Sequence, residues 1–256
     1  MKRVVTALFL IPFFCYIVLW APHWAFLVIV AAVAILCFRE YSGLVALHGI
    51  GKPGLFGYVA GLLVLLLPGK DGAFFVLIAI LAMSLALRSR EMVQALPEAA
   101  AVLLGIAYVF GSLRCAVELR AVSPYWLFFA LSLNWAGDIA ALYVGRSFGR
   151  HKLAPEVSPA KSWEGFIGST VASVIYGALY FRWLLPAAPL TEALALTVIA
   201  NIAGQLGDLC ESAMKRGAGV KDSGTLLPGH GGWLDRVDSS LFALPVVYFV
   251  VSNFGW

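Results

Sequence analysis

Long apolar stretches alternate with short polar connections along most of this chain, and their lengths predict membrane-spanning helices. The hydrocarbon core of a bilayer is about 30 Å thick, so a spanning helix needs about 20 mostly apolar residues. We predict an all-α polytopic membrane protein with about nine transmembrane helices, or eight if the short third and fourth stretches do not both cross. The predicted spans cover about 4–21, 24–38, 54–68, 72–87, 99–117, 125–145, 163–183, 190–212 and 239–255.

Composition agrees with this class of protein. Hydrophobic residues make up 61% of the 256 residues and charged ones 12%, with a mean hydropathy of +0.90, whereas a soluble domain is about one quarter charged. The first apolar run reaches Trp20 without a small-residue cleavage site, so we expect a retained helix rather than a signal peptide. The net charge of +4 is too small to predict a nucleic-acid partner, and four dispersed cysteines predict neither disulfides nor a zinc site.

Lysine and arginine positions predict the orientation of the helices, because cytoplasmic loops are enriched in both residues. With the N-terminus in the cytoplasm, fourteen of the 18 Lys and Arg residues fall on the cytoplasmic side, and the C-terminus lies on the far side. The polar connections 146–162 and 213–238 are then cytoplasmic. We divide the chain into N-terminal membrane helices over 1–120, with about five spans, and a C-terminal membrane region over 121–256.

The N-terminal region carries little candidate chemistry. We expect Arg39 and Glu40 to be anchors at the level of the lipid headgroups. Arg114 and Glu118 stand four residues apart, on one helix face, and predict a structural ion pair.

Charged side chains concentrate instead between Gly207 and Asp238, where 9 of 32 residues are charged. These residues are Asp208, Glu211, Lys215, Arg216, Lys221, Asp222, Asp235, Arg236 and Asp238. Interspersed glycines, such as Gly231 and Gly232, let backbone amides approach a ligand closely. The acidic side chains could bind a metal, the basic ones could bind phosphate, and the glycines leave backbone amides accessible to a ligand. Together they predict a phosphate-handling site.

A polar stripe leads into this segment along the eighth predicted helix. Asn201, Gln205, Asp208, Ser212 and Lys215 recur at spacings of four and three, which places them on one helix face. That face must contact protein or water, because lipid cannot satisfy polar groups. Contacts between helices would explain Asn201 and Gln205. They do not explain why the stripe ends in charged residues beside a glycine-rich loop.

Three carboxylates predict a metal site. Asp235 and Asp238 stand three apart where the last helix should begin, and with Asp208 they offer hard oxygen ligands. Mg²⁺ prefers octahedral oxygen and usually takes one or two carboxylates together with substrate phosphates. The alternative for Asp235 and Asp238 is a favourable position at a helix N-terminus.

A fourth acid, Asp138, lies inside the sixth predicted span, four residues after Asn134. An ionisable residue within a span is by default a functional candidate. The alternative is a buried acid paired with a lysine elsewhere. The following loop carries Arg146, Arg150, Lys152 and Lys161, which fit both a topology signal and phosphate binding. We expect residues 158–162 to begin the seventh helix, where the N-terminus attracts phosphate.

These residues resemble the phosphatidate cytidylyltransferase (CDP-diacylglycerol synthase) family in order and spacing. The resemblance is strong over 207–239 and is carried by Ser212–Arg216, Lys221–Asp222, Leu227–Gly232 and Asp235–Asp238. A looser second region covers about 134–168, with Asp138, Gly145–Gly149 and Ser158–Gly165. Ala160 and Ser162 depart from the family pattern, which puts Ala160 in doubt as a substrate contact.

The resemblance implies transfer of CMP from CTP to phosphatidate, giving CDP-diacylglycerol and pyrophosphate, with Mg²⁺ and allowing for a second cation. The metal ligands implied are Asp208, Asp235 and Asp238. The groups expected to act on the phosphates are Lys215, Arg216, Lys221, Asp222, His230 and Arg236. The expected substrate contacts are Ser212, Gly231, Gly232, Lys161, Ser158 and Asp138.

Two alternatives are kept. One is the same chemistry on another membrane lipid, or a CTP-dependent lipid kinase. The other is a Mg²⁺ or phosphate transporter with Asp138 and Asp208 in its pathway, although transporters more often carry polar groups in paired halves. By resemblance we expect the partners CTP, phosphatidate and the bilayer of a bacterial inner membrane, with a cytoplasmic active site, and we allow for a homodimer.

Overall fold

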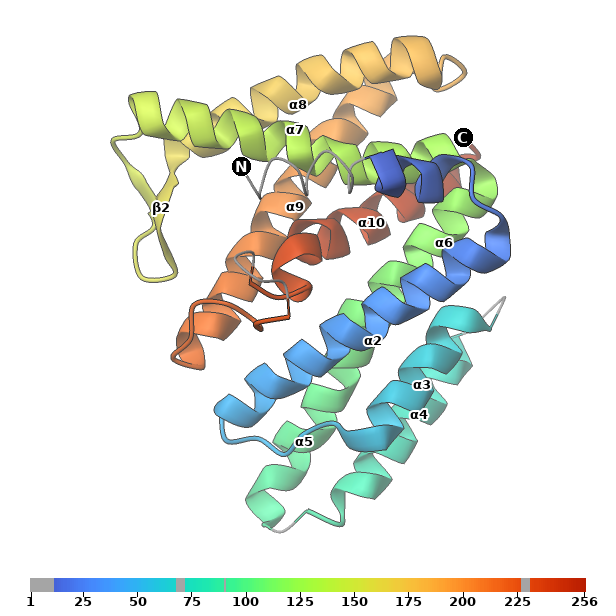
Figure 1. Ribbon diagram of the computed structural model, residues 1–256, viewed down its shortest axis with the longest axis vertical. Helices are drawn as coiled ribbons and strands as arrows, with labels where there is room; N and C mark the ends of the chain where they lie inside the picture. The colour runs from blue at the N-terminus through green and yellow to red at the C-terminus, as the bar shows by residue number, and fades with distance from the viewer. Residues whose placement is uncertain (1–11, 68–71, 90, 227–230) are drawn as a thin grey trace.

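The computed structural model describes residues 12–67, 72–89, 91–226 and 231–256. The chain is dominated by helices (Figure 1). Residues 12–19 are helical and are followed by a longer series of elements. These are α2 (His23–Leu47), α3 (Gly54–Leu66), α4 (Gly72–Ala86), α5 (Met92–Gly105), η1 (Ile106–Gly111), α6 (Ser112–Val122), α7 (Pro124–Phe148), β1 (Lys152–Ala154), β2 (Ser158–Ser162), α8 (Trp163–Leu184), α9 (Leu190–Gly217) and α10 (Leu234–Phe254).

Five helices within the described ranges are long and apolar enough to cross a membrane. They are α2, the continuous helix 92–122, α7, α9 and α10, while α3 and α4 are shorter apolar helices. The helix α8, with 22 residues, is not in that group of five. The count of about nine spans and the orientation of the termini therefore stay predictions.

Several helices are longer than the apolar runs that predicted them. The span expected at 24–38 continues to Leu47, and the span expected at 99–117 is part of a helix over 92–122 with a π-helical turn at η1. Helical hydrogen bonding is satisfied within the segment itself, so a helix continues past the point where its side chains stop being apolar. Glu40 consequently lies inside α2 rather than at its end.

The all-α prediction is wrong at residues 152–162, which form an antiparallel hairpin. Lys152 pairs with Ser162 and Ala154 with Ser158. Ser158–Ser162 is thus a strand, and α8 begins only at Trp163, where the Ser162 hydroxyl accepts a hydrogen bond from the Gly165 amide at 3.1 Å. Pro155 and Pro159 lie in this hairpin, and a proline disfavours helix for the residue before it.

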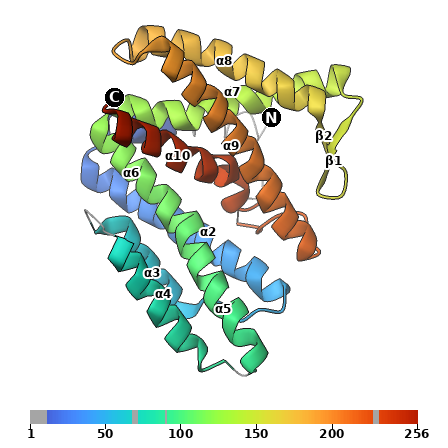
Figure 2. The same ribbon diagram turned by 180° about the vertical axis from the view of Figure 1, so that it is seen from behind.

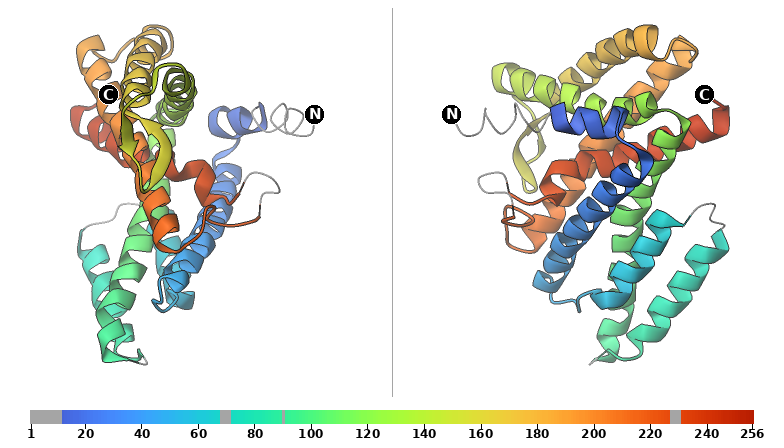
Figure 3. Two further views of the ribbon diagram at one scale, coloured as in Figure 1. Left: turned by 90° about the vertical axis from the view of Figure 1, so that its left-hand side faces the viewer. Right: turned by 45° about the vertical axis from the view of Figure 1, so that its right-hand side comes forward.

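The helices form two groups that meet at α10. In one group α7 and α8 run side by side, and α9 packs against α8 and α10. In the other, α2 packs on α3 and α5, and α4 packs on α5 (Figures 1 and 2). Because α10 packs on both α2 and α9, residues of the N-terminal region come next to the polar segment. The hairpin contacts α9 through the Lys161–Asp208 ion pair and the hydrogen bond from Arg216 to the Val157 carbonyl, and it lies in front of α9 in the left view of Figure 3.

Candidate functional site

Glycines let three helices approach closely where the acids lie. A Cβ atom on Gly137 of α7 would lie 2.6 Å from the Asn201 amide nitrogen, and one on Gly207 of α9 would lie 2.7 Å from the Asp238 backbone oxygen. Each glycine precedes an acid, Asp138 or Asp208. The charge of Asp208 acts on Asp138 and on Asp238, so the three carboxylates share one region. We call Asp138, Asp208 and Asp238 the acidic cluster.

The polar stripe of α9 forms hydrogen bonds that join α9 to α8. The Asn201 amide donates to the hydroxyls of Ser169 and Ser173 on α8, at 3.1 and 2.9 Å. Its carbonyl oxygen accepts from Thr170 at 3.2 Å and from Gln205 at 2.8 Å. Asn201 therefore joins α9 to α8, which is the structural role that the sequence allowed for it, whereas Gln205 donates within α9 to the Asn201 carbonyl oxygen.

The hairpin brings a base to the acidic cluster. The Lys161 ammonium lies 2.8 Å from one carboxylate oxygen of Asp208, and the Ser212 hydroxyl donates to the other at 3.2 Å. The side chain of Asp208 is 34% exposed and that of Lys161 is 25% exposed. Asp208 thus faces the hairpin and is open to a ligand. Asp138 is exposed, and among the described residues it forms no ion pair, since Lys161 pairs with Asp208 instead. The alternative of a buried acid paired with a lysine is therefore not the arrangement found.

A second group of charges, one to two turns further along α9, is buried. The Lys215 ammonium lies 2.6 Å from the Asp235 carboxylate and also pairs with Glu211. The side chains of Lys215, Asp235 and Glu211 are 10%, 7% and 0% exposed. Charges so far from water require close partners. We call Lys215, Asp235 and Glu211 the buried triad. Their charged groups contact other protein groups rather than water.

The second oxygen of Asp235 accepts hydrogen bonds from the loop between α9 and α10, residues 218–233, which we call the glycine-rich loop. It accepts hydrogen bonds from the Ser223 amide and hydroxyl, both at 2.9 Å, and from the Gly232 amide at 2.7 Å. Gly231 has a φ of +77°, a left-handed backbone that glycine adopts without strain. Both oxygens of Asp235 are therefore engaged by protein donors.

The remaining predicted residues surround this loop. Arg216, Lys221, Asp222 and Arg236 are exposed. Arg216 donates to the Val157 carbonyl at 3.3 Å and to the Val220 carbonyl at 2.9 Å, which ties the end of α9 to the hairpin. Ser158 is half-buried in β2, and His230 lies outside the described residues.

The donor chemistry fits a hard cation best at the acidic cluster. Asp238 accepts one hydrogen bond, from the Ser239 amide at 2.8 Å, which leaves its other oxygen for a ligand among the described residues. Asp138 and Asp208 add further carboxylate oxygens, the ligands that Mg²⁺ prefers. Within the described ranges, no three His, Cys, Asp or Glu side chains are already placed at ligating geometry. The acidic cluster thus offers suitable oxygen ligands, but among the described residues they are not yet arranged around one metal position.

Sequence reasoning misassigned Glu40. It is 5% exposed and accepts hydrogen bonds from Ser223, Trp233 and Leu234, so it is not a headgroup anchor. An acid inside an apolar helix, close to Phe38 and Tyr41, was the signal that could have identified a buried role.

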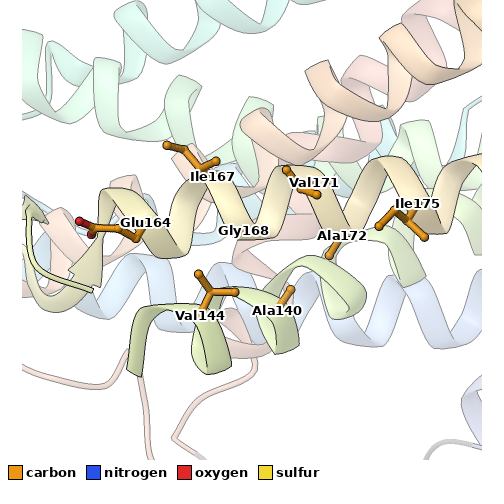
Figure 4. Close-up of a pocket in the computed structure, with 8 residues that line it drawn as sticks. All are labelled: Ala140, Val144, Glu164, Ile167, Gly168, Val171, Ala172 and Ile175. Carbon is orange, nitrogen blue, oxygen red and sulfur yellow. The ribbon is translucent and has the colours of Figure 1, made fainter. Parts of the chain in front are cut away.

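An apolar groove of about 500 Å³ lies between α7 and α8, and none of the three acids of the acidic cluster lines it (Figure 4). Its walls are Ala140, Val144, Ile167, Gly168, Val171, Ala172 and Ile175, with Glu164 at one end. Glu164 is occupied by His151, whose Nδ1 lies 2.6 Å from the carboxylate. The groove carries no polar group for phosphate chemistry within the described residues.

Five apolar helices of spanning length within the described residues, three of which carry the acidic cluster, fit an integral membrane protein. Comparison with known proteins gives the family. The family model described as "Cytidylyltransferase family" matches residues 1–254, and the chain belongs to that family.

Three relatives share the name phosphatidate cytidylyltransferase. The chain is 33% identical over 266 residues to the protein of Bacillus subtilis (strain 168), with 99% of this chain and 98% of the relative covered. It is 36% identical to the proteins of Staphylococcus saprophyticus and Staphylococcus aureus (strain COL), with 84% of this chain and 85% of each relative covered.

Proposed function

We propose that this protein transfers CMP from CTP to phosphatidate and releases pyrophosphate, forming CDP-diacylglycerol. The observation that carries the proposal is the ion pair between Lys161 and Asp208. Each residue comes from a different one of the two segments that resemble the family, and the fold brings both segments to one place. The names of the relatives support the same reaction.

In the proposed reaction a phosphate oxygen of phosphatidate attacks the α-phosphorus of CTP in line. The new P–O bond forms as the bond to the bridging oxygen breaks, and that oxygen leaves with pyrophosphate. Phosphatidate is already ionised, so no strong general base is required. The protein's task is then to align the reactants and to offset the developing negative charge.

We propose Mg²⁺ as the cofactor, held by Asp208 and Asp238 beside Asp138, with room for a second cation. When bound, Mg²⁺ would neutralise phosphate charge and orient the triphosphate. Asp235 was also predicted as a ligand, but it would first have to release Lys215 or the loop amides. Its present contacts favour a role in holding the loop.

The bases around the site would bind the phosphates. Lys161 pairs with Asp208 here and would turn to a phosphate once a cation occupies that carboxylate. The exposed Arg216, Lys221 and Arg236 can reach the same ligand, while Lys215 acts from within the buried triad. Backbone amides at Gly231 and Gly232, the hydroxyls of Ser158 and Ser212, and the side chains of Asp222 and His230 would complete the contacts.

We further propose that the site lies on the cytoplasmic face of a bacterial inner membrane, with the N-terminus on the same side. CTP would arrive from the cytoplasm, and the lipid phosphate would sit at headgroup depth. About nine spans and a dimeric assembly remain compatible with this placement.

The test is pyrophosphate release by detergent-purified protein given CTP and phosphatidate, with and without Mg²⁺. We expect release that requires both the lipid and the metal. Release with another lipid phosphate in place of phosphatidate would reassign the acceptor. A well-folded protein that releases no pyrophosphate with any lipid phosphate would reject the transferase.

A further inference from the structure

The carboxylate of Glu40, on α2, is wrapped by the glycine-rich loop. One oxygen accepts from the Trp233 amide at 3.0 Å, and the other accepts from the Leu234 amide at 2.8 Å and from the Ser223 hydroxyl at 2.9 Å. These donors come from the loop between α9 and α10 and from the first residue of α10. A buried carboxylate is tolerated when several donors satisfy it, as they do here.

Glu40 completes the N-terminus of α10. The first amides of a helix have no partner within it, and among the described residues the side chain of Trp233, at the N-cap, makes no capping hydrogen bond. The carboxylate from α2 supplies the missing acceptor, and its negative charge suits the helix dipole. The start of α10 is thus fixed by a residue almost two hundred positions earlier.

Two glycines of the loop leave space for this carboxylate. A Cβ atom on Gly224 would lie 2.6 Å from a Glu40 oxygen, and one on Gly232 would be closer still. Neither position has room for a side chain while Glu40 keeps its place. The loop and the carboxylate are therefore fitted to each other.

The residues that bind Glu40 also contact Asp235 of the candidate site, directly or through a neighbouring residue. The Ser223 hydroxyl lies 2.9 Å from both Glu40 and Asp235, and the Gly232 amide next to Trp233 donates to Asp235. The end of α2 is also docked on α9, where the His48 ring lies 2.9 Å from the Met214 carbonyl. Asp235 binds Lys215, so the position of the buried triad depends on where Glu40 holds the loop.

We propose that Glu40 is a positioning residue for the site. It fastens the loop and the first turn of α10, so that Asp235 keeps Lys215 in place and Asp238 stays beside Asp208. The N-terminal membrane region thereby contributes to the reaction without contacting substrate. This inference deepens the proposed transferase function and rests on it for its kinetic consequence.

The test compares Glu40→Gln with Glu91→Gln, the same change at an exposed position on the same half of the chain. A glutamine retains one acceptor oxygen and points an NH₂ group at the remaining donors. We expect hydrogen exchange in the peptide covering residues 231–236 to become at least tenfold faster. We also expect kcat to fall at least tenfold, with the KM for phosphatidate within twofold and helical content unchanged. Glu91→Gln should match the wild type in every readout.

Ser223→Ala is the second variant, because it removes the hydroxyl that Glu40 and Asp235 share and leaves both carboxylates and the Trp233 and Leu234 amides in place. It should show the same local effect at about threefold, and it keeps the proposal testable if Glu40→Gln does not fold. Exchange at the wild-type rate in the 231–236 peptide of the folded variants would overturn the proposal. So would faster exchange spread evenly over α2, α7 and α10 with an unchanged kcat, which is the signature of a purely structural role.

The exchange measurement does not depend on turnover. A wild-type protein that is inactive with CTP and lipid would reject the proposed function, whereas local exchange would still decide whether Glu40 holds the loop.

Discussion

The acidic cluster and the buried triad are both built around α9, which supplies Asp208 to the first and Glu211 and Lys215 to the second, yet their environments differ. Asp208 is 34% exposed and pairs with Lys161 of the hairpin, which is itself 25% exposed. Asp235 is 7% exposed, and protein donors occupy both of its oxygens. An open carboxylate can exchange its partner for a ligand, while a buried and fully bonded one maintains the fold around it. Spacing in the sequence does not separate these two roles.

The largest effect on activity is expected from Asp208→Asn, which should lower kcat about a thousandfold, in the range for loss of a principal electrostatic group. The unfolding temperature should change little, since the side chain is partly exposed and its ion pair adds little stability. Pyrophosphate release and thermal unfolding in the same detergent measure the two effects. Near-normal turnover would remove Asp208 from the metal site.

Asp235→Ala, unlike Asp208→Asn, should lower the stability of the protein more than its activity. It leaves Lys215 and Glu211 buried without their third partner and frees the donors of the loop, and breaking a buried ion pair costs about 3–5 kcal/mol. We therefore expect a clear loss of unfolding free energy, measured by denaturant titration in detergent, together with reduced activity. An Asp235→Ala protein as stable as the wild type, but inactive without extra Mg²⁺, would make Asp235 a metal ligand after all.

Lys161→Ala should have the smallest effect of the three. It removes a partly exposed base from Asp208, and we expect a drop of about tenfold in kcat/KM for CTP with unchanged stability. The loss should be larger at low ionic strength, because salt screens exposed charges. Lys152→Ala is the matched control, since Lys152 lies on the same hairpin and its ammonium donates to the Pro159 carbonyl at 2.8 Å. Equal effects of the two substitutions would count against a specific role for Lys161.

Much of the local structure was predictable. The apolar runs located the described helices, and the four-residue spacing of Arg114 and Glu118 correctly predicted an ion pair. The spacing of Asn201, Gln205 and Asp208 correctly predicted a polar face, and its side chains contact other polar groups of the protein. These patterns succeed because helical geometry alone fixes which side chains share a face.

The misses share another cause. The hairpin at 152–162 was expected as a loop and a helix start, because the pairing of two short strands depends on contacts across a turn rather than on periodicity. Glu40 was assigned to the headgroup region, because its three donors lie about 190 residues away along the chain.

The sequence by itself determined that this is a helical membrane protein, that one segment concentrates acids, bases and glycines, and which family that segment resembles. Tertiary structure alone decided which acid meets which base. Asp208 received Lys161 because the hairpin folds back along α9, and Asp235 received Lys215 and the loop because α10 packs beside α9. Helical periodicity acts over a few residues, whereas the surroundings of a charge are set by whichever distant segment packs on it.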